Sequence, residues 1–176
     1  EEFTAAVEEA TDGRVTFEVF GNGALGGEVE VAEQVQLGAL DMTLVTGGPV
    51  GNFVSDFSVL EMPFLFRDVE HVYATLDSEV GQELMTKLDG AGFKALGIWE
   101  NGMRHIASNK AIKTPEDMNG LKMRTLENPI YIDMYSSLGA DPTPIAFPEL
   151  YTSLQQGVVD STDLAYAIMN TSKFYE

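Results

Sequence analysis

Residues 121–162 read LKMRTLENPIYIDMYSSLGADPTPIAFPELYTSLQQGVVDST, and this stretch decides the fold class. Strand and helix signals alternate along it. The expected order is strand (LKMRT), capped helix (NPIYIDMYSSLG), short strand (TPIA), helix (FPELYTSLQQG) and strand (VVDST). Consecutive strands that are separated by helices usually run parallel, so the pattern predicts an α/β fold with a mostly parallel sheet.

The alternation continues towards the N-terminus. Further strands are expected over 15–20, 40–45, 93–100 and 104–108, and helices over 28–37, 69–76 and 79–89. Ser78 is suited to cap the last of these helices, and Thr114 followed by Pro115 is typical of another helix start. The stretch TGGPVGN after the 40–45 strand is expected to be a loop.

One pattern occurs twice along the chain. VQLGALDMT (35–43) and LQQGVVDST (154–162) share the spacing Gln-x-Gly-x-x-Asp-x-Thr in the order helix, turn, strand. Two lobes built on the same unit would explain the repetition, with WENGM (99–103) as the crossing between them. Chance is the alternative, because glycine ends helices in many folds.

Composition restricts the possible partners. The net charge is −18, with 28 acidic and 10 basic residues, and no cysteine occurs. Such a charge repels nucleic acid and anionic lipid, and the absence of cysteine excludes disulfides and thiolate sites. The apolar run FSVLEMPFLF is too short for a membrane span and contains Glu61. Neither His71 nor His105 stands in a metal or catalytic-triad spacing, so no metal or cofactor is expected.

A glycine motif raises the possibility of a dinucleotide site. GNGALG (21–26) fits the spacing G-x-G-x-x-G and lies between an expected strand and an expected helix. However, Glu28, Glu30 and Glu33 crowd the helix start, where a pyrophosphate needs positive potential. No carboxylate lies at 46–48 to bind a ribose. The motif therefore favours a plain strand-to-helix turn, and a dinucleotide-dependent α/β enzyme is the alternative.

Two arginines stand where open α/β sheets bind their ligands. Arg124 ends the strand LKMRT, and Arg104 opens another strand directly after the proposed crossing. Such ligands lie outside the carboxyl ends of strands, and a planar guanidinium can hold a carboxylate through two parallel hydrogen bonds. The spacing indicates a carboxylate site, with a solvated basic patch as the alternative.

The chain resembles the solute-binding proteins of tripartite ATP-independent periplasmic (TRAP) transporters. The resemblance covers nearly all of it and is carried by four stretches: TDGRVTFEVFGNGALGGEVEVAEQVQLGALDMTLV, LEMPFLFRD, GMRHIASNKAIKTPEDMNGLKMRT and LGADPTPIAFPELYTSLQQGVVD. It implies a two-lobed periplasmic-binding-protein-like fold, each lobe a mostly parallel sheet flanked by helices. It also implies a protein without catalysis, which captures an organic anion between its lobes and delivers it to TRAP permease subunits in the membrane.

The resemblance also implies site residues. The family's main carboxylate-binding arginine matches Arg124 in KMR, and a second one matches Arg104 in GMR. The aromatic residue of the AF-x-E-L-Y segment matches Phe147, which would wall the ligand. In the first lobe, Thr46 and Gly47 follow LDMTLV and are expected at the cleft.

The sequence departs from the family at one position. Many members carry an asparagine that contacts the ligand where this chain has Leu164, within VVDSTDLAY. The lost amide leaves the ligand subclass open, and Asp163 or Tyr166 could compensate for it.

The resemblance finally sets the expected organisation. Residues 1–101 are expected to form one lobe without its first strand, and 102–176 a second lobe without its C-terminal part. The chain is then an internal fragment of a monomeric periplasmic protein whose signal peptide lies outside it.

Overall fold

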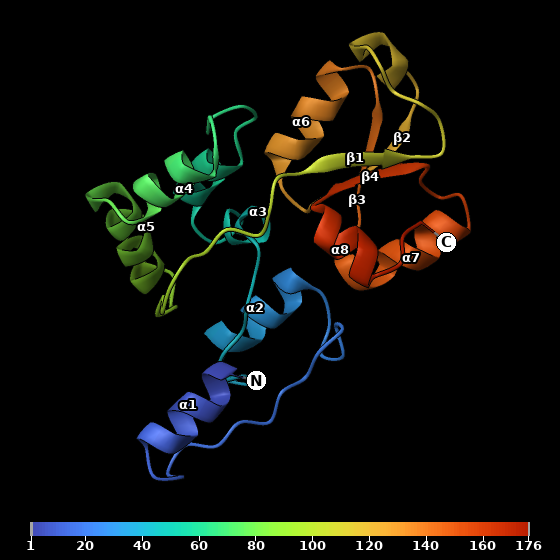
Figure 1. Ribbon diagram of the computed structural model, residues 1–176. Helices are drawn as coiled ribbons and strands as arrows, with labels where there is room; N and C mark the ends of the chain where they lie inside the picture. The colour runs from blue at the N-terminus through green and yellow to red at the C-terminus, as the bar shows by residue number, and fades with distance from the viewer. Residues whose placement is uncertain (1, 176) are drawn as a thin grey trace.

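The structure is a computed structural model that describes residues 2–175. Its first hundred residues hold helices, which appear as the blue and green elements of Figure 1. These are α1 (Glu2–Ala10), α2 (Glu28–Gln36), α3 (Gly47–Val50), the 3-10 helix η1 (Ser55–Glu61), α4 (Val69–Leu76) and α5 (Glu79–Gly90). A small buried cluster of Val54, Phe57 and Leu84 lies where α3, η1 and α5 meet.

The remaining residues alternate between strands and helices, as the sequence predicts. The elements are β1 (His105–Ser108), the 3-10 helix η2 (Pro115–Met118), β2 (Lys122–Thr125), α6 (Pro129–Ser137), β3 (Asp141–Pro144), α7 (Phe147–Gln155), β4 (Ser161–Leu164) and α8 (Tyr166–Thr171). Thr114 caps η2 as expected, through a capping box with Asp117, and Asn128 caps α6. These local signals explain why the predicted and observed elements agree here.

The four strands form one sheet in the order β1-β4-β2-β3. β2 runs parallel to both β3 and β4, and β1 pairs antiparallel with β4. The prediction of a mostly parallel sheet is therefore confirmed for this half of the chain. Two strands are shifted from the prediction at both ends: β3 spans Asp141–Pro144 where 143–146 is expected, and β4 spans Ser161–Leu164 where 158–162 is expected.

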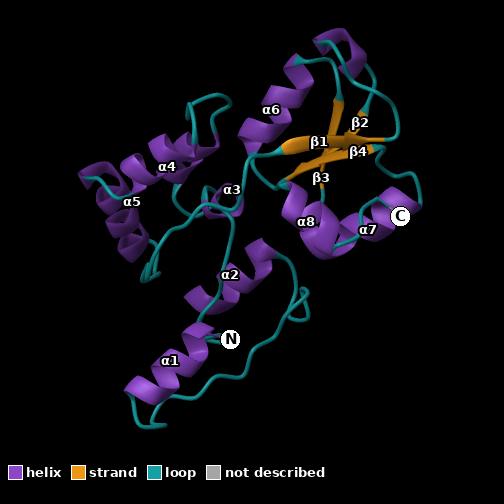
Figure 2. Ribbon diagram, viewed as in Figure 1, coloured by secondary structure: helices purple, strands orange, loops and turns teal. Residues whose placement is uncertain are grey.

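Helices cover the sheet, and two apolar clusters fill the space between (Figure 2). The first cluster includes α6 and consists of Met118, Leu121, Met123, Leu126, Tyr131, Tyr135 and Ala140. The second consists of Ile145, Leu150, Val159 and Leu164, with residues of α7 and α8 packed against it. Residues in both clusters are nearly inaccessible, so this half has a well-formed core.

Three expected strands are not formed among the described residues. Segments 15–20, 40–45 and 93–100 have no strand pairing. A strand needs a neighbour to satisfy its backbone groups, and no described segment pairs with these three. Their apolar side chains are accordingly exposed: Val19 is 72% accessible, Leu44 71% and Leu96 69%. The expected loop after residue 45 also differs, since it contains the short helix α3.

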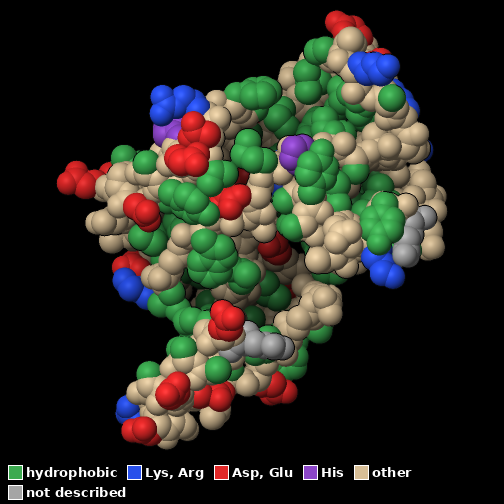
Figure 3. Space-filling view, viewed as in Figure 1, with side chains coloured by type: hydrophobic (Ala, Val, Ile, Leu, Met, Phe, Trp, Pro, Cys, Tyr) green, Lys and Arg blue, Asp and Glu red, His purple; other side chains and the backbone are tan. Residues whose placement is uncertain are grey.

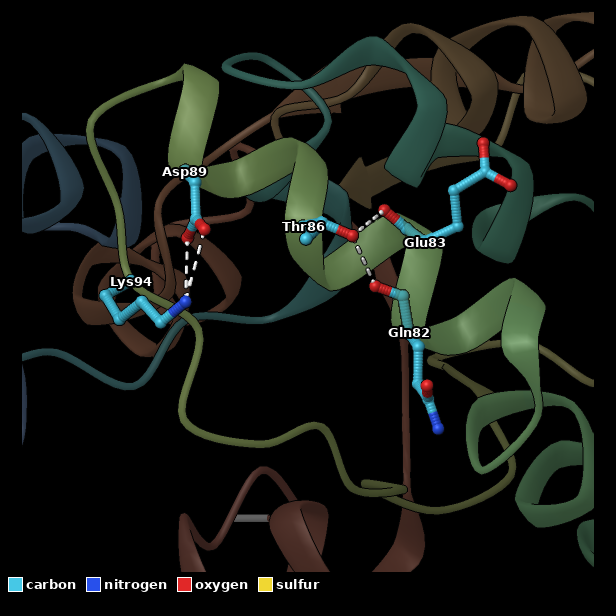
Figure 4. A network of polar contacts seen from close by, with 5 residues as sticks. All are labelled: Gln82, Glu83, Thr86, Asp89 and Lys94. Atoms are coloured by element: carbon cyan, nitrogen blue, oxygen red, sulfur yellow. Dashed lines mark hydrogen bonds and ion pairs between the residues drawn. The ribbon is translucent and has the colours of Figure 1, made fainter.

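Polar contacts occur within α5 and just after it, before the 93–100 segment begins. Thr86 bonds back to the carbonyl oxygens of Gln82 and Glu83 at 2.7 and 3.0 Å within α5 (Figure 4). Beyond the helix, Lys94 forms an ion pair with Asp89 at 3.1 Å. No helix in the described range combines the length and apolar character that crossing a membrane requires.

Candidate functional site

Arg124 lies near the carboxyl end of β2 and is almost wholly buried, with 1% of its surface accessible. Its Nε donates to the carbonyl oxygen of Ile145 at 2.9 Å. One terminal nitrogen has no hydrogen-bond partner. Burial, and then the charge of Arg104, lower the pKa of the Arg124 guanidinium to about 10. A buried cation with an unused donor is a costly arrangement, and an anionic ligand would relieve it.

Two threonine hydroxyls near Arg124 are also buried without partners. They belong to Thr125, the next residue on β2, and Thr162, which stands opposite Arg124 on the parallel strand β4. Buried polar atoms in proteins nearly always bond to protein, water or ligand. The centre of the sheet therefore offers several unused polar atoms.

Arg104 has a different environment, although both arginines were expected at the ligand. Its Nε and one terminal nitrogen donate to the two carboxylate oxygens of Asp163 at 2.7 and 3.0 Å, and that nitrogen also bonds the Asp163 carbonyl at 2.6 Å. The guanidinium lies 5.0 Å from the ring centroid of Tyr131. Burial works to lower the pKa of Arg104, but Asp163 raises it above its usual range. Arg104 is thus already paired with a carboxylate of this chain.

The two residues expected in the first lobe lie against acidic side chains. The backbone N–H and the hydroxyl of Thr46 donate to the two oxygens of Glu28 at 2.9 and 2.8 Å. Gly47 faces the Oε1 atom of Glu61, and a Cβ at this position would collide with that oxygen. Glycine here lets a carboxylate approach the backbone.

Glu61 joins the two halves of the chain. It ends η1, and its Oε2 accepts a hydrogen bond from the hydroxyl of Tyr131 on α6. Burial raises the pKa of Glu61, against the opposing effects of Tyr131 and Arg104. Burial also raises the pKa of Tyr131, so its hydroxyl stays a donor. A polar chain therefore runs from Glu61 through Tyr131 and Arg104 to Asp163.

Sequence reasoning missed Glu28, Glu61 and the pairing of Asp163 with Arg104. In an acidic chain a single carboxylate is uninformative, since 28 acids are present. Glu61 alone carried a signal, because it interrupts the apolar run FSVLEMPFLF. An acid within such a run is rarely placed there without a polar partner.

Further hydrogen bonds join the halves beside this site. The side-chain nitrogen of Asn128 donates to the carbonyl of Gly48 at 2.8 Å and to the hydroxyl of Ser58 at 3.2 Å. Asn52 donates to the carbonyl of Glu127 at 2.6 Å. A hollow at this junction is lined by Val29, Asn52, Glu127, Asn128, Pro129, Ile132 and Pro144. It lies at the ends of β2 and β3, the edge of the sheet that binds ligands in open α/β folds.

Two other expected site residues lie in the second apolar cluster. Phe147 is half-buried at the start of α7, with its ring 5.9 Å from that of Phe174 in an edge-to-face contact. Leu164 is 3% accessible and packs with Ile145, Leu150 and Val159. Both side chains are apolar and could only form a wall of the site. Their contact with a ligand stays a prediction.

The glycine stretch 21–26 packs in a way that disfavours a phosphate. A Cβ at Gly23 would collide with Pro148, and one at Gly26 would collide with the carboxylate of Glu30. A negative side chain thus covers the loop at the start of α2. In the part of the chain that the structure describes, no group of three metal-ligating side chains occurs.

Comparisons with known proteins give one consistent result. A solute-binding protein of Verminephrobacter eiseniae is 48% identical over 173 residues, which make up 98% of this chain and 52% of that protein. The crystal structure of a TRAP periplasmic solute-binding protein from Polaromonas sp. JS666, bound to D-erythronate, is 43% identical with a TM-score of 0.95. It matches over 98% of this chain and 57% of its own.

A second solved structure holds a different ligand. It is a TRAP periplasmic solute-binding protein from Sulfurospirillum deleyianum, with bound succinate, at 36% identity and a TM-score of 0.94. The match covers 98% of this chain and 56% of that one. The chain thus spans about half the length of the relatives that it matches.

The family assignment rests on the whole sequence. Residues 1–176 match the family described as bacterial extracellular solute-binding protein, family 7. The solved relatives share a two-lobed α/β fold and come from TRAP transport systems. The chain therefore belongs to the family 7 bacterial extracellular solute-binding proteins, and is related to the periplasmic solute-binding proteins of TRAP transporters.

Proposed function

We propose that this chain is part of an extracytoplasmic solute-binding protein that captures a carboxylate-bearing organic anion between two lobes. The observation that carries the proposal is the buried Arg124 guanidinium with an unpartnered terminal nitrogen. A ligand carboxylate would pair with it as a charge-assisted hydrogen bond, which is about twice as strong as a neutral one. Residues 1–101 and 102–176 form the two lobes, and the chain crosses near Asn101.

The relatives support a carboxylate as the recognised group. D-Erythronate and succinate, bound in the two solved relatives, differ in their hydroxyl groups and in the number of carboxylates, but each has at least one carboxylate. Thr46 and Gly47 contribute the first-lobe wall of the site, and Phe147 and Leu164 an apolar wall in the second lobe. Arg104 contributes to ligand binding indirectly, because its guanidinium is already paired with the Asp163 carboxylate.

The proposed protein works with a transporter and not as an enzyme. It is exported by a signal peptide, acts in the periplasm as a monomer and delivers its ligand to TRAP permease subunits. It needs no cofactor. The dinucleotide-dependent enzyme is the weaker candidate, because Glu30 covers the glycine loop that would hold the pyrophosphate.

A thermal-shift panel tests the proposal. The intact protein is heated with NAD(P) and with a series of mono- and dicarboxylic organic acids, one compound at a time. At about 100 times its Kd a ligand adds roughly 2.7 kcal/mol to the stability of the fold, a clear rise in melting temperature. At least one organic acid is expected to give this rise. Stabilisation by NAD(P) alone would support the enzyme instead.

A further inference from the structure

Two carboxylates lie beside the part of the site that Arg124 serves. Glu28 holds Thr46 through both of its oxygens, and Glu61 lies against Gly47. The charge of Glu28 acts on both Arg124 and Glu61. Gly48, the next residue, lies against Leu126 just beyond β2, so both carboxylates stand near the end of the strand that carries Arg124.

Glu61 has unused hydrogen-bonding capacity there. Its Oε2 is bonded to the Tyr131 hydroxyl, whereas no donor among the described residues reaches its Oε1. The positive charge that acts on Glu61 is that of Arg104, and Asp163 neutralises Arg104 through a two-pronged ion pair. Glu61 thus keeps a free acceptor oxygen and a charge without a dedicated cation.

The position of Glu61 is held from both sides. Gly47 provides space for the carboxylate because it has no Cβ, and Tyr131 fixes the other oxygen from the facing half of the chain. An acceptor that is held in this way can bond a ligand hydroxyl at little entropic cost. It would repel a second ligand carboxylate, since like charges at a desolvated contact cost several kcal/mol.

We propose that Glu61 is a specificity-determining residue that selects hydroxylated monocarboxylates, the aldonate class of sugar acids, over the corresponding dicarboxylates. The ligand carboxylate pairs with Arg124, and a hydroxyl group further along the ligand donates to Glu61. This inference rests on the proposed function, because it takes the Arg124 region as the ligand site.

Matched pairs of ligands test the selection directly. D-Erythronate and meso-tartrate differ only in a terminal CH2OH that is replaced by a carboxylate, and D-galactonate and galactarate differ in the same way. Calorimetric titrations of the intact protein are run at pH 8, where both carboxyl groups of each free diacid are ionised. In the pair that binds, the monocarboxylate is expected to have at least a tenfold lower Kd than its diacid.

Variants assign the selection to Glu61. Glu61→Gln keeps the size and the acceptor but removes the charge, so the preference for the monocarboxylate should fall at least fivefold, mainly through tighter binding of the diacid. Glu83→Gln is the matched control: it removes the same charge from the exposed face of α5 (Figure 4) and should leave the preference unchanged. If Glu61→Gln fails to fold, Glu61→Asp takes its place. It draws the oxygen back by one methylene, and so should weaken monocarboxylate binding at least fivefold with exclusion of the diacid retained.

The outcomes separate this inference from the proposed function. A diacid that binds as tightly as its partner, or a preference that survives Glu61→Gln, overturns the role of Glu61 and leaves organic-acid binding standing. If none of these acids, nor any other carboxylate, binds the intact protein, both the inference and the proposed function are wrong.

Discussion

Arg104 and Arg124 carry the same side chain, but their partners give them different roles. Arg104 forms a two-pronged ion pair with Asp163, whose side chain is only 4% exposed. Arg124 has one neutral acceptor and an unused nitrogen. Since an arginine without a carboxylate is the one with capacity for a ligand, the site centres on Arg124. Spacing alone placed both residues near the sheet edge but could not distinguish them.

Removing Arg104 is expected to damage the fold. Arg104→Ala leaves the buried Asp163 carboxylate without its cation, and breaking a buried pair from one side costs about 3–5 kcal/mol; the partial exposure of Arg104 reduces this to about 2–3 kcal/mol. Urea denaturation of the ligand-free protein measures the loss. The double variant Arg104→Ala/Asp163→Asn should recover part of it, because no unpaired charge remains. Equal losses in the single and double variants would mean that the pair is not coupled.

Glu61 should make the stability of the fold depend on pH. Burial raises the pKa of Glu61, so the folded protein binds its proton more tightly than the unfolded chain does. The associated stability is therefore fully present below the unfolded pKa of about 4.3, and is lost as the pH rises through the folded pKa. Glu61→Gln lacks this contribution to the pH dependence of stability, because the amide does not titrate.

The measurement is urea denaturation of both proteins between pH 4 and pH 8. The free energy of unfolding of Glu61→Gln, relative to that of the parent, should increase as the pH rises. A relative stability that falls over this range would show that the folded state favours the charged carboxylate.

At the scale of single elements, Asn128 both caps α6 and connects it to the first half of the chain. Asn128 accepts from the backbone N–H of Ile130 at 2.9 Å and donates to the Gly48 carbonyl at 2.8 Å in the other half of the chain. The first contact caps the helix, and the second ties α6 to α3. The capping role was foreseeable from the sequence Asn-Pro, whereas the tie to Gly48 was not, because it joins residues far apart in the chain.

Asn128→Ala should therefore cost more than the loss of a cap. The cap contributes about 1 kcal/mol, and losing the hydrogen bonds to the Gly48 carbonyl and the Ser58 hydroxyl adds about 0.5–1.5 kcal/mol each. Urea denaturation should show a total loss of about 2–4 kcal/mol. Ser78→Ala is the control: it removes the cap of α5 and a local bond to the Thr75 carbonyl, but no contact between the halves, and should cost about 1 kcal/mol. If the two variants lose the same amount, the contact between α6 and α3 contributes nothing to stability.

The elements also show what the sequence could and could not predict. α4 has the predicted bounds, and β2 and α6 follow closely, since caps, proline and apolar spacing act locally. The expected strand over 15–20 has the same alternation but no partner in the described residues, and pairing is not a local property. The acidic side chains of the site could not be assigned for a related reason, because their partners lie far away in the sequence.

At the scale of the whole molecule, apolar and acidic side chains share the surface (Figure 3). The segments without strand pairing expose large apolar residues, among them Phe20 and Trp99, which are 50% and 65% accessible. An apolar surface of this kind is normally covered in a stable protein.

The 176-residue chain by itself should consequently bind the dye ANS strongly and unfold over a broad temperature range. Fluorescence with ANS and a calorimetric melt measure the two properties. Trp99 emission should also lie at long wavelength, as for a solvated indole. A sharp melt at high temperature without dye binding would show that these side chains are covered in solution.

Arg124 is the central residue of the proposed site, as the partner of the ligand carboxylate, and isothermal titration calorimetry of the intact protein with its best-binding organic acid tests this role directly. Arg124→Ala should weaken binding by about 2–5 kcal/mol, roughly 30-fold to several-thousand-fold in Kd, because the bound carboxylate loses its charge partner in a desolvated site. Arg124→Lys should not restore the affinity, since an ammonium cannot reproduce the planar fork. A Kd for Arg124→Ala within about twofold of the parent value would place the carboxylate elsewhere and contradict the account.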